Sequence, residues 1–224
     1  MFDHIKAVLF DLDGTLIDSA PDLAFAANKM RTDRHLDPLP LKDFRPMTGT
    51  GARGMLSVAF GMVIEDADFD VYKNEFFSNY EACMTAHTHP FSEVPGLIEK
   101  IVNAKIPWGV VTNKSRRFAL PLIQSIPLFN SAGAIVCGDS TPYSKPHPEP
   151  LLEAARQLNI EPGLCLYVGD DERDVIAGRS AGMSVVAAAY GYLGVGKCVK
   201  DWNADAQIAT PKSLLLLLNL PQMD

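Results

Sequence analysis

Short apolar runs alternate with segments of helical periodicity along much of the chain. Five runs have the length and composition of buried strands, at residues 5–10, 108–111, 134–137, 164–168 and 183–187. Helical spacing separates or follows these runs, at residues 115–126, 150–158 and 175–181. Strands that are separated by helices pair in parallel, so the pattern predicts an α/β fold with a doubly wound parallel sheet.

Residues 18–84 interrupt this alternation because they read as almost wholly helical. The stretch is too long for a simple connection between a strand and a helix. Ser19 and Asp22 resemble a capping box that opens a helix. Further along, one helical face carries an aromatic stripe, which we interpret as core packing: Phe69, Tyr72, Phe76, Tyr80 and Cys83. We therefore predict a core of residues 1–17 and 85–224, with a small helical domain inserted at 18–84.

Two carboxylates follow the first apolar run directly. In an extended segment, residues two apart point the same way, so Asp11 and Asp13 would face one pocket. Such strings also occur in ordinary turns, because Asp and Gly suit tight turns. Two anions so close favour a hard divalent cation with oxygen ligands, and a phosphate group would then find the metal and the exposed amides of the Gly14 turn within reach.

Three further polar segments lie where they would meet these carboxylates. Thr112 ends the second run, and Asp170 with Asp174 follows the fourth. Lys145 lies in a proline-rich loop, which restricts how far its backbone can move. The carboxyl ends of parallel strands share one edge of a sheet, where ligands bind. The spacing therefore predicts a site that contains both acidic and basic groups.

Composition narrows the classes of partner. The chain has 224 residues, 47% of them hydrophobic, enough for one substantial core and a smaller one. A net charge of −7 argues against nucleic acid or an anionic membrane as the main partner. The four cysteines have no paired spacing, which favours free thiols in the cytoplasm. We expect a monomer or a weak homodimer.

The motifs together resemble those of the haloacid dehalogenase superfamily, in its phosphatase branch. The matching residues are Asp11 to Thr15, then Thr112, then Lys145 in Lys-Pro-His-Pro, and then Gly169-Asp170 with Asp174. Residues 45–60 and 169–174 also resemble bacterial phosphoglycolate phosphatases and N-acetylmuramic acid 6-phosphate phosphatases. The resemblance implies a Rossmann-like core with a cap that selects the substrate.

The resemblance also implies residue roles in a Mg²⁺-dependent phosphomonoester hydrolase. Asp11 would be the nucleophile that forms an aspartyl-phosphate, and Asp13 would be the general acid and base. Thr112 and Lys145 would hold the phosphoryl group. The metal would bind among Asp11, Asp13, Asp170 and Asp174, together with the Leu12 carbonyl. Asp174 would approach the metal or orient Lys145, and Asp171 is an alternative for that role.

Substrate contacts are expected from two places. Near the phosphate these are Gly14, Thr15 and Asn113, and on the cap loop they are Arg45, Thr48, Gly49 and Arg53. The two arginines would bind a substrate carboxylate, or they are surface charges.

The expected substrate is a small phosphorylated metabolite, with 2-phosphoglycolate first. N-acetylmuramic acid 6-phosphate or another sugar phosphate is the alternative. A phosphosugar mutase and a non-catalytic binding protein of the same fold are further alternatives. The presence of Asp13 favours phosphoryl transfer, and Gly169 favours a hydrolase over a mutase.

Overall fold

A six-stranded parallel sheet forms the centre of the computed structural model, which describes residues 2–222. The strand order is β5-β4-β1-β6-β7-β8, and every neighbouring pair is parallel. The strands are β1 (Ala7–Phe10), β4 (Trp108–Val111), β5 (Ala134–Val136), β6 (Cys165–Gly169), β7 (Ser184–Ala188) and β8 (Ala206–Ile208). The predicted α/β class and doubly wound sheet are confirmed.

Alternate residues of each strand are buried on opposite faces of the sheet. Val8 and Phe10 of β1 belong to one apolar cluster, whereas Ala7 and Leu9 belong to another. The first cluster includes side chains of α5 (Val94–Asn103), α6 (Arg116–Ser125) and α9 (Ser213–Leu217). The second includes side chains of α7 (Glu149–Leu158) and α8 (Glu172–Ser180). Burial on both faces explains why the strands read as continuous apolar runs.

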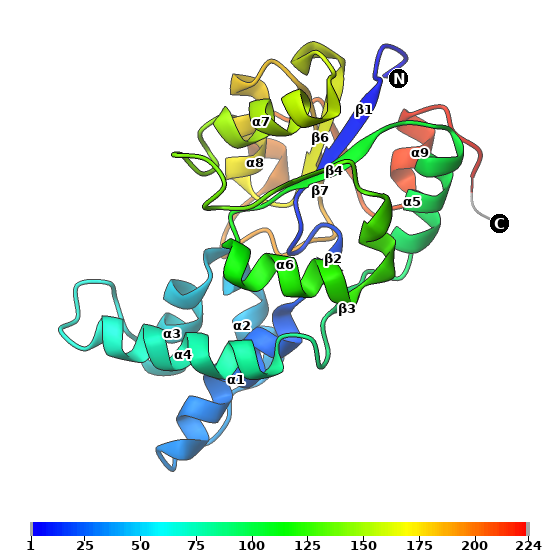
Figure 1. Cartoon of the computed structure of the whole chain (residues 1–224). Coiled ribbons are helices and arrows are strands. Elements are labelled where there is room, and N and C mark those ends of the chain that lie inside the picture. Colours follow the sequence, from blue (N-terminus) through cyan, green and yellow to red (C-terminus); the bar gives the residue numbers. More distant parts are fainter. Residues whose placement is uncertain (1, 223–224) are drawn as a thin grey trace.

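Helices fill the chain between two short strands that pair antiparallel, β2 (Ile17–Asp18) and β3 (His89–Pro90). These elements are α1 (Ala20–Asp33), α2 (Leu41–Phe44), the 3₁₀ helix η1 (Arg45–Thr50), α3 (Ala52–Phe60) and α4 (Phe69–Cys83). They lie together on one side of the sheet domain (Figure 1). The pairing of β2 with β3 places the two crossings between the helices and the sheet side by side. Three more 3₁₀ helices are η2 (Pro127–Ser131), η3 (Pro162–Leu164) and η4 (Val199–Trp202).

The predicted capping box at the start of α1 is wrong. Ser19 is the N-cap, but its hydroxyl makes no capping hydrogen bond and instead donates to Asp13. The Asp22 carboxylate accepts hydrogen bonds from the amides of His87 and Thr88, at 3.0 and 2.7 Å. Asp22 therefore ties the first turn of α1 to the returning chain.

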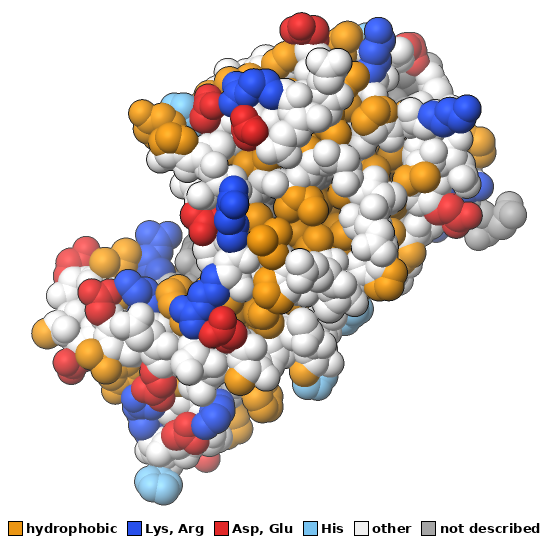
Figure 2. All heavy atoms as spheres, in the orientation of Figure 1, with side chains coloured by type: hydrophobic (Ala, Val, Ile, Leu, Met, Phe, Trp, Pro, Cys, Tyr) orange, Lys and Arg blue, Asp and Glu red, His pale blue; other side chains and the backbone are white. Residues whose placement is uncertain are grey.

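Charged side chains of both signs are interspersed over the face drawn in Figure 2. The molecule narrows between the group of helices α1–α4 and the sheet domain (Figure 2). In residues 2–222, no helix is long and apolar enough to cross a membrane.

Candidate active site

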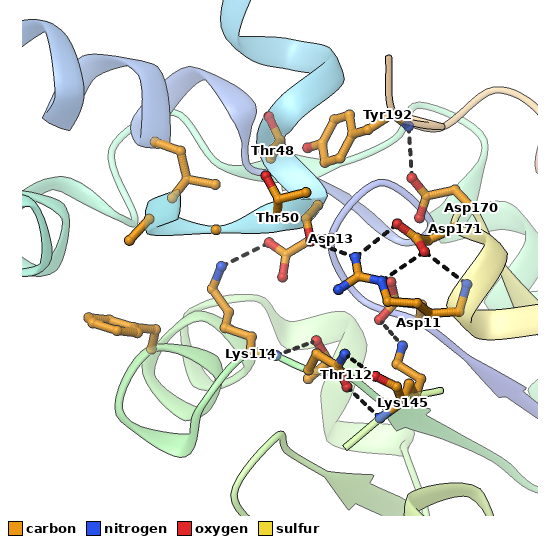
Figure 3. Close-up of a pocket in the computed structure, with 18 of the residues that line it drawn as sticks. Asp11, Asp13, Thr48, Thr50, Thr112, Lys114, Lys145, Asp170, Asp171 and Tyr192 are labelled. Carbon is orange, nitrogen blue, oxygen red and sulfur yellow. Dashed lines mark hydrogen bonds and ion pairs between the residues drawn. The ribbon is translucent and has the colours of Figure 1, made fainter. Parts of the chain in front are cut away.

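A cavity of about 430 Å³ lies between the carboxyl ends of the central strands and the inserted helices. The sheet side contributes residues that follow β1, β4 and β6, and the helical side contributes η1, α3 and α4 (Figure 3). The predicted site residues that line it are Asp11, Asp13, Thr48, Gly49, Thr112, Asn113, Lys145, Asp170 and Asp174.

Lys145 joins the groups at the base of this cavity. Its Nζ atom lies 2.8 Å from Asp11 Oδ1 and 2.7 Å from Asp174 Oδ1. The same atom donates to the Val111 carbonyl at 3.0 Å and to the Tyr167 hydroxyl at 2.8 Å. Lys145 is only 5% exposed, so these contacts hold its ammonium group in one place. The structure therefore pairs Asp174 with Lys145.

Three carboxylates converge at the base of the cavity, and Lys145 pairs with two of them. Asp11, Asp170 and Asp174 each offer an oxygen, and these oxygens lie within 4.8 Å of one another. Burial, opposed by Lys145, raises the pKa of Asp11 to about 7. Burial and the neighbouring Asp11 and Asp174 raise the pKa of Asp170 well above its usual value. The excess of buried negative charge and the oxygen donors fit a hard divalent cation such as Mg²⁺.

The two other predicted metal donors are placed differently. The Asp13 side chain is not a member of the three-carboxylate cluster. The Leu12 carbonyl accepts the amides of Leu16 and Ile17, at 2.9 and 3.0 Å. That carbonyl therefore closes the turn after β1, and its binding to a metal stays a prediction.

Gly14 and Thr15 support Asp170 and do not line the cavity. Gly14 has a φ of +87°, and a Cβ atom there would lie 2.2 Å from Asp170 Oδ2. The Thr15 hydroxyl donates to Asp170 Oδ1 at 2.9 Å, and the Tyr192 amide donates to Oδ2 at 2.7 Å. Glycine is required at position 14 for both its positive φ and its close approach to the carboxylate.

Asp13 faces the cavity from a different direction, toward Lys114 (Figure 3). Lys114 Nζ lies 3.0 Å from Asp13 Oδ1, and Ser19 also donates to that oxygen. Burial alone would lower the pKa of Lys114, but the neighbouring Asp13 and Tyr80 outweigh this effect and hold the pKa above its usual value. Lys114 is thus a charged residue of the cavity wall that was not among the predicted site residues.

Thr112 and Asn113 follow β4 but have different surroundings. The Thr112 hydroxyl accepts the Lys114 amide at 3.1 Å, at the cavity wall. Asn113 lines the cavity, but its side chain is engaged by the Lys145 backbone. Asn113 Nδ2 donates to the Lys145 carbonyl and Asn113 Oδ1 accepts the Lys145 amide, both at 2.9 Å. Asn113 therefore fixes the loop that carries Lys145.

The first turn of α8 separates the roles of the neighbouring acids. Asp171 is the N-cap and accepts the Arg173 amide, while Asp174 Oδ2 accepts the Asp171 amide at 3.0 Å. The Arg173 guanidinium pairs with Asp171 at 2.8 Å and donates to the Gly49 carbonyl at 2.7 Å. Arg173 therefore links α8 to the inserted helices, whereas Asp174 points toward Lys145.

The cap residues predicted to contact substrate divide into two groups. Thr48 and Gly49 line the cavity, but Arg45 and Arg53 do not. Arg45 forms a two-point ion pair with Asp18, at 3.0 and 2.8 Å. Arg53 is exposed on α3. Neither arginine lines the cavity, and their binding of a substrate carboxylate stays a prediction.

Several cavity residues were not predicted. The position of Lys114 could have been recognised from the sequence, because it directly follows Thr112 and Asn113 at the end of a strand. No sequence feature marked Tyr192 and Arg173, because their contacts depend on the fold. The same holds for Tyr167, which does not line the cavity but contacts Lys145. Phe76 and Tyr80 were interpreted as core packing, and the structure shows that they are buried yet also line the cavity.

Comparison with known proteins gives the relationships of the chain. A family model described as haloacid dehalogenase-like hydrolase matches residues 8–188. An N-acetylmuramic acid 6-phosphate phosphatase from Pseudomonas aeruginosa is 38% identical over 216 residues, which is 96% of each chain. A phosphoglycolate phosphatase from Xanthomonas campestris pv. campestris is 38% identical over 209 residues, covering 93% of this chain and 94% of the relative.

A solved structure agrees with these relatives. A predicted phosphoglycolate phosphatase from Haemophilus somnus superimposes with a TM-score of 0.83 at 26% identity, covering 96% of this chain and 98% of the other. The similarity therefore extends over the sheet domain and the inserted helices alike. On the strength of the family model and of these relatives, this chain belongs to the haloacid dehalogenase-like hydrolase family.

Proposed function

We propose that this protein is a Mg²⁺-dependent phosphomonoesterase that acts on a small phosphorylated metabolite, with 2-phosphoglycolate as the leading substrate. One observation carries the proposal. A buried lysine joins a carboxylate at the end of β1 to a carboxylate of α8, at 2.8 and 2.7 Å, beside a third buried carboxylate. A transferring phosphoryl group needs such a fixed nucleophile next to positive charge.

Asp11 is the proposed nucleophile. Its carboxylate attacks phosphorus and forms an aspartyl-phosphate, while the bond from phosphorus to the leaving alcohol oxygen breaks. Asp13 donates a proton to that oxygen and then accepts one from the water that hydrolyses the intermediate. Ser19 and Lys114 orient Asp13 on the cavity wall. Lys145 and the Thr112 hydroxyl stabilise the phosphoryl oxygens.

Asp11 and Asp170 are the proposed holders of Mg²⁺, and Asp174 positions Lys145 beside them. When bound, the ion would supply positive charge that offsets the carboxylates and the incoming phosphate. Thr15, the Tyr192 amide and Gly14 fix Asp170 for this role. The acidic cluster has one ammonium group for three carboxylates, which supports a requirement for the ion.

The substrate proposal rests on the relatives. One is named for phosphoglycolate and another for N-acetylmuramic acid 6-phosphate, and they are equally identical to this chain at 38%. The second compound is therefore the alternative substrate. We propose that residues 18–84 form a cap that selects between such compounds, because η1, α3 and α4 supply one wall of the cavity.

We also propose a cytoplasmic protein that is a monomer or a weak homodimer. The four cysteines are free in the structure, which is typical of a reducing compartment. Sedimentation analysis over a range of protein concentrations would determine the oligomeric state.

The experiment is phosphate release from a panel of metabolites, with Mg²⁺ or with excess chelator. The panel contains 2-phosphoglycolate, N-acetylmuramic acid 6-phosphate, several sugar phosphates and 4-nitrophenyl phosphate. Asp11→Asn should abolish release and retain the thermal stability of a folded protein. Asp70→Asn is the matched control, because the Asp70 side chain is 80% exposed on α4. Metal-independent release, or full activity of Asp11→Asn, would contradict the proposal.

A further inference from the structure

The cavity has a second polar feature, away from the carboxylate cluster. Among the described residues, its lining contains the cationic side chains of Lys114, Lys145 and Arg173. Lys145 is engaged by Asp11 and Asp174, and Arg173 is engaged by Asp171 and the Gly49 carbonyl. Lys114 pairs with one carboxylate oxygen only, that of Asp13. An ammonium group has three N–H donors, so Lys114 retains capacity for another anion.

A buried hydroxyl lies beside Lys114. Tyr80 comes from α4 and is 2% exposed, its hydroxyl faces Lys114, and no oxygen within residues 2–222 accepts the hydroxyl proton. Lys114 Nζ lies 5.0 Å from the centre of the Tyr80 ring. Buried hydroxyls in proteins are almost always paired, so the Tyr80 hydroxyl in this cavity wall is a candidate donor to a ligand that also contacts Lys114.

The other hydroxyls on the helical side of the cavity are already used. Thr48 donates to the Phe44 carbonyl at 3.3 Å, and Thr50 donates to the Met47 carbonyl at 2.6 Å. Around Tyr80 the wall is aromatic, since its ring is stacked on Phe76 and packs against Phe118. A single cation and one free hydroxyl in apolar surroundings suit a small anion, because low polarity strengthens charged hydrogen bonds.

The two named relatives suggest which anion this is. Both compounds, phosphoglycolate and N-acetylmuramic acid 6-phosphate, are phosphate esters of an alcohol that also carries a carboxylic acid. The arginines that the sequence offered for a carboxylate lie outside the cavity lining. We infer that Lys114 and Tyr80 bind the carboxylate of the substrate, and that the enzyme selects phosphate esters whose alcohol portion carries an acid. This inference rests on the proposed phosphatase function.

Two matched pairs of compounds test it. The first is 2-phosphoglycolate against its neutral amide, and the second is N-acetylmuramic acid 6-phosphate against N-acetylglucosamine 6-phosphate, which lacks the acid. The readout is the ratio of kcat/KM for the acid to kcat/KM for its neutral partner. We expect the wild-type ratio to favour the acid in at least one pair. Lys114→Met should lower that ratio by about 10- to 100-fold, as expected for one hydrogen bond to a charged group.

Tyr80→Phe removes only the hydroxyl and should lower the ratio by about 3- to 10-fold, mainly through KM for the acid. Lys73→Met is the matched control, because Lys73 lies on the same helix and pairs with the exposed Asp70. The control should keep the wild-type ratio. Thermal melts of each variant would establish that it is folded.

Three results would overturn the inference. The inference requires the wild-type enzyme to prefer the acid, so equal kcat/KM values within both pairs would refute it. An unchanged ratio in Lys114→Met, with kcat reduced equally for acid and neutral compound, would show that Lys114 only positions Asp13. Collapse of the ratio in Arg53→Met, but not in Lys114→Met, would assign the carboxylate to the cap arginine. Failure of the phosphatase proposal itself is distinct, because then no compound, including 4-nitrophenyl phosphate, would release phosphate.

Discussion

Replacing Lys145 with methionine tests how strongly the buried charges of the site depend on one another. The substitution keeps a long side chain but removes the ammonium group, which lies 2.8 Å from Asp11 and 2.7 Å from Asp174. The Lys145 and Asp174 side chains are 3% and 1% exposed. Removing Lys145 leaves three neighbouring carboxylates with no cation inside the cluster.

The expected loss of stability in Lys145→Met depends on the burial of the charges more than on the distances between them. At an effective dielectric of about 20, each of these contacts is worth about 6 kcal/mol of Coulomb attraction before desolvation is subtracted. Desolvation of the ammonium group offsets much of this, and breaking a buried pair usually costs about 3–5 kcal/mol. The Lys73–Asp70 pair is as short, at 2.6 Å, but its side chains are 35% and 80% exposed. Lys73→Met should therefore cost at most about 1 kcal/mol.

The assay is thermal and urea denaturation in the presence of chelator. For a chain of this size about 1 kcal/mol corresponds to about 2–4 °C, so Lys145→Met should lower Tm by about 6–20 °C. Asp174→Asn added to Lys145→Met should recover part of the loss, because it removes one of the uncompensated charges. Equal stabilities of Lys145→Met and Lys73→Met would refute the reasoning, as would a further loss in the double variant.

Three other substitutions probe neighbouring parts of the structure. Asp13→Asn should reduce turnover of alkyl phosphates by about 10²–10⁴-fold, because the leaving alcohol is then not protonated. The leaving group of 4-nitrophenyl phosphate needs no proton, so with this substrate the variant should accumulate a phosphoenzyme that hydroxylamine cleaves. Absence of protein-bound phosphate after an acid quench would contradict this role. Gly14→Ala places a Cβ atom 2.2 Å from Asp170 Oδ2 at a φ of +87°, so a shifted Mg²⁺ activation curve is expected, and an unchanged curve would count against the assigned metal site. Asp22→Ala removes the acceptor of the His87 and Thr88 amides and should lower the free energy of unfolding by about 1–3 kcal/mol in urea titrations. A loss no larger than that of Asp70→Ala would contradict this expectation.

The sheet could be predicted from the sequence because its central strands are buried on both faces. Such strands read as continuous apolar runs, and the run at 108–111 coincides with β4 (Trp108–Val111). Strand β8 (Ala206–Ile208) was missed, because it lies at the sheet edge and only Ile208 is fully buried. A three-residue edge strand has no apolar run to identify it.

The residues on the sheet side of the cavity could also be predicted from the sequence, because they follow the strands directly. Parallel strands bring Asp11, Thr112 and Asp170 to one edge whatever the details of packing. The role of Tyr167 could not be predicted in this way. It lies within β6, and only the packed structure shows that its hydroxyl reaches Lys145 Nζ at 2.8 Å. Side-chain reach depends on tertiary distances, which sequence spacing does not contain.

The recognition side shows the same limit more sharply. The aromatic stripe of α4 predicted a buried face, and Phe76 and Tyr80 are indeed buried, at 1% and 2% exposed. Helical periodicity cannot distinguish a face that packs on a core from a face that closes a cavity, because both exclude water. What distinguishes Tyr80 is Lys114, a partner from a distant part of the chain, together with its unpaired hydroxyl. Since one partner lies on the inserted helices and the other follows β4, carboxylate selection at this point requires both parts of the molecule to be in contact.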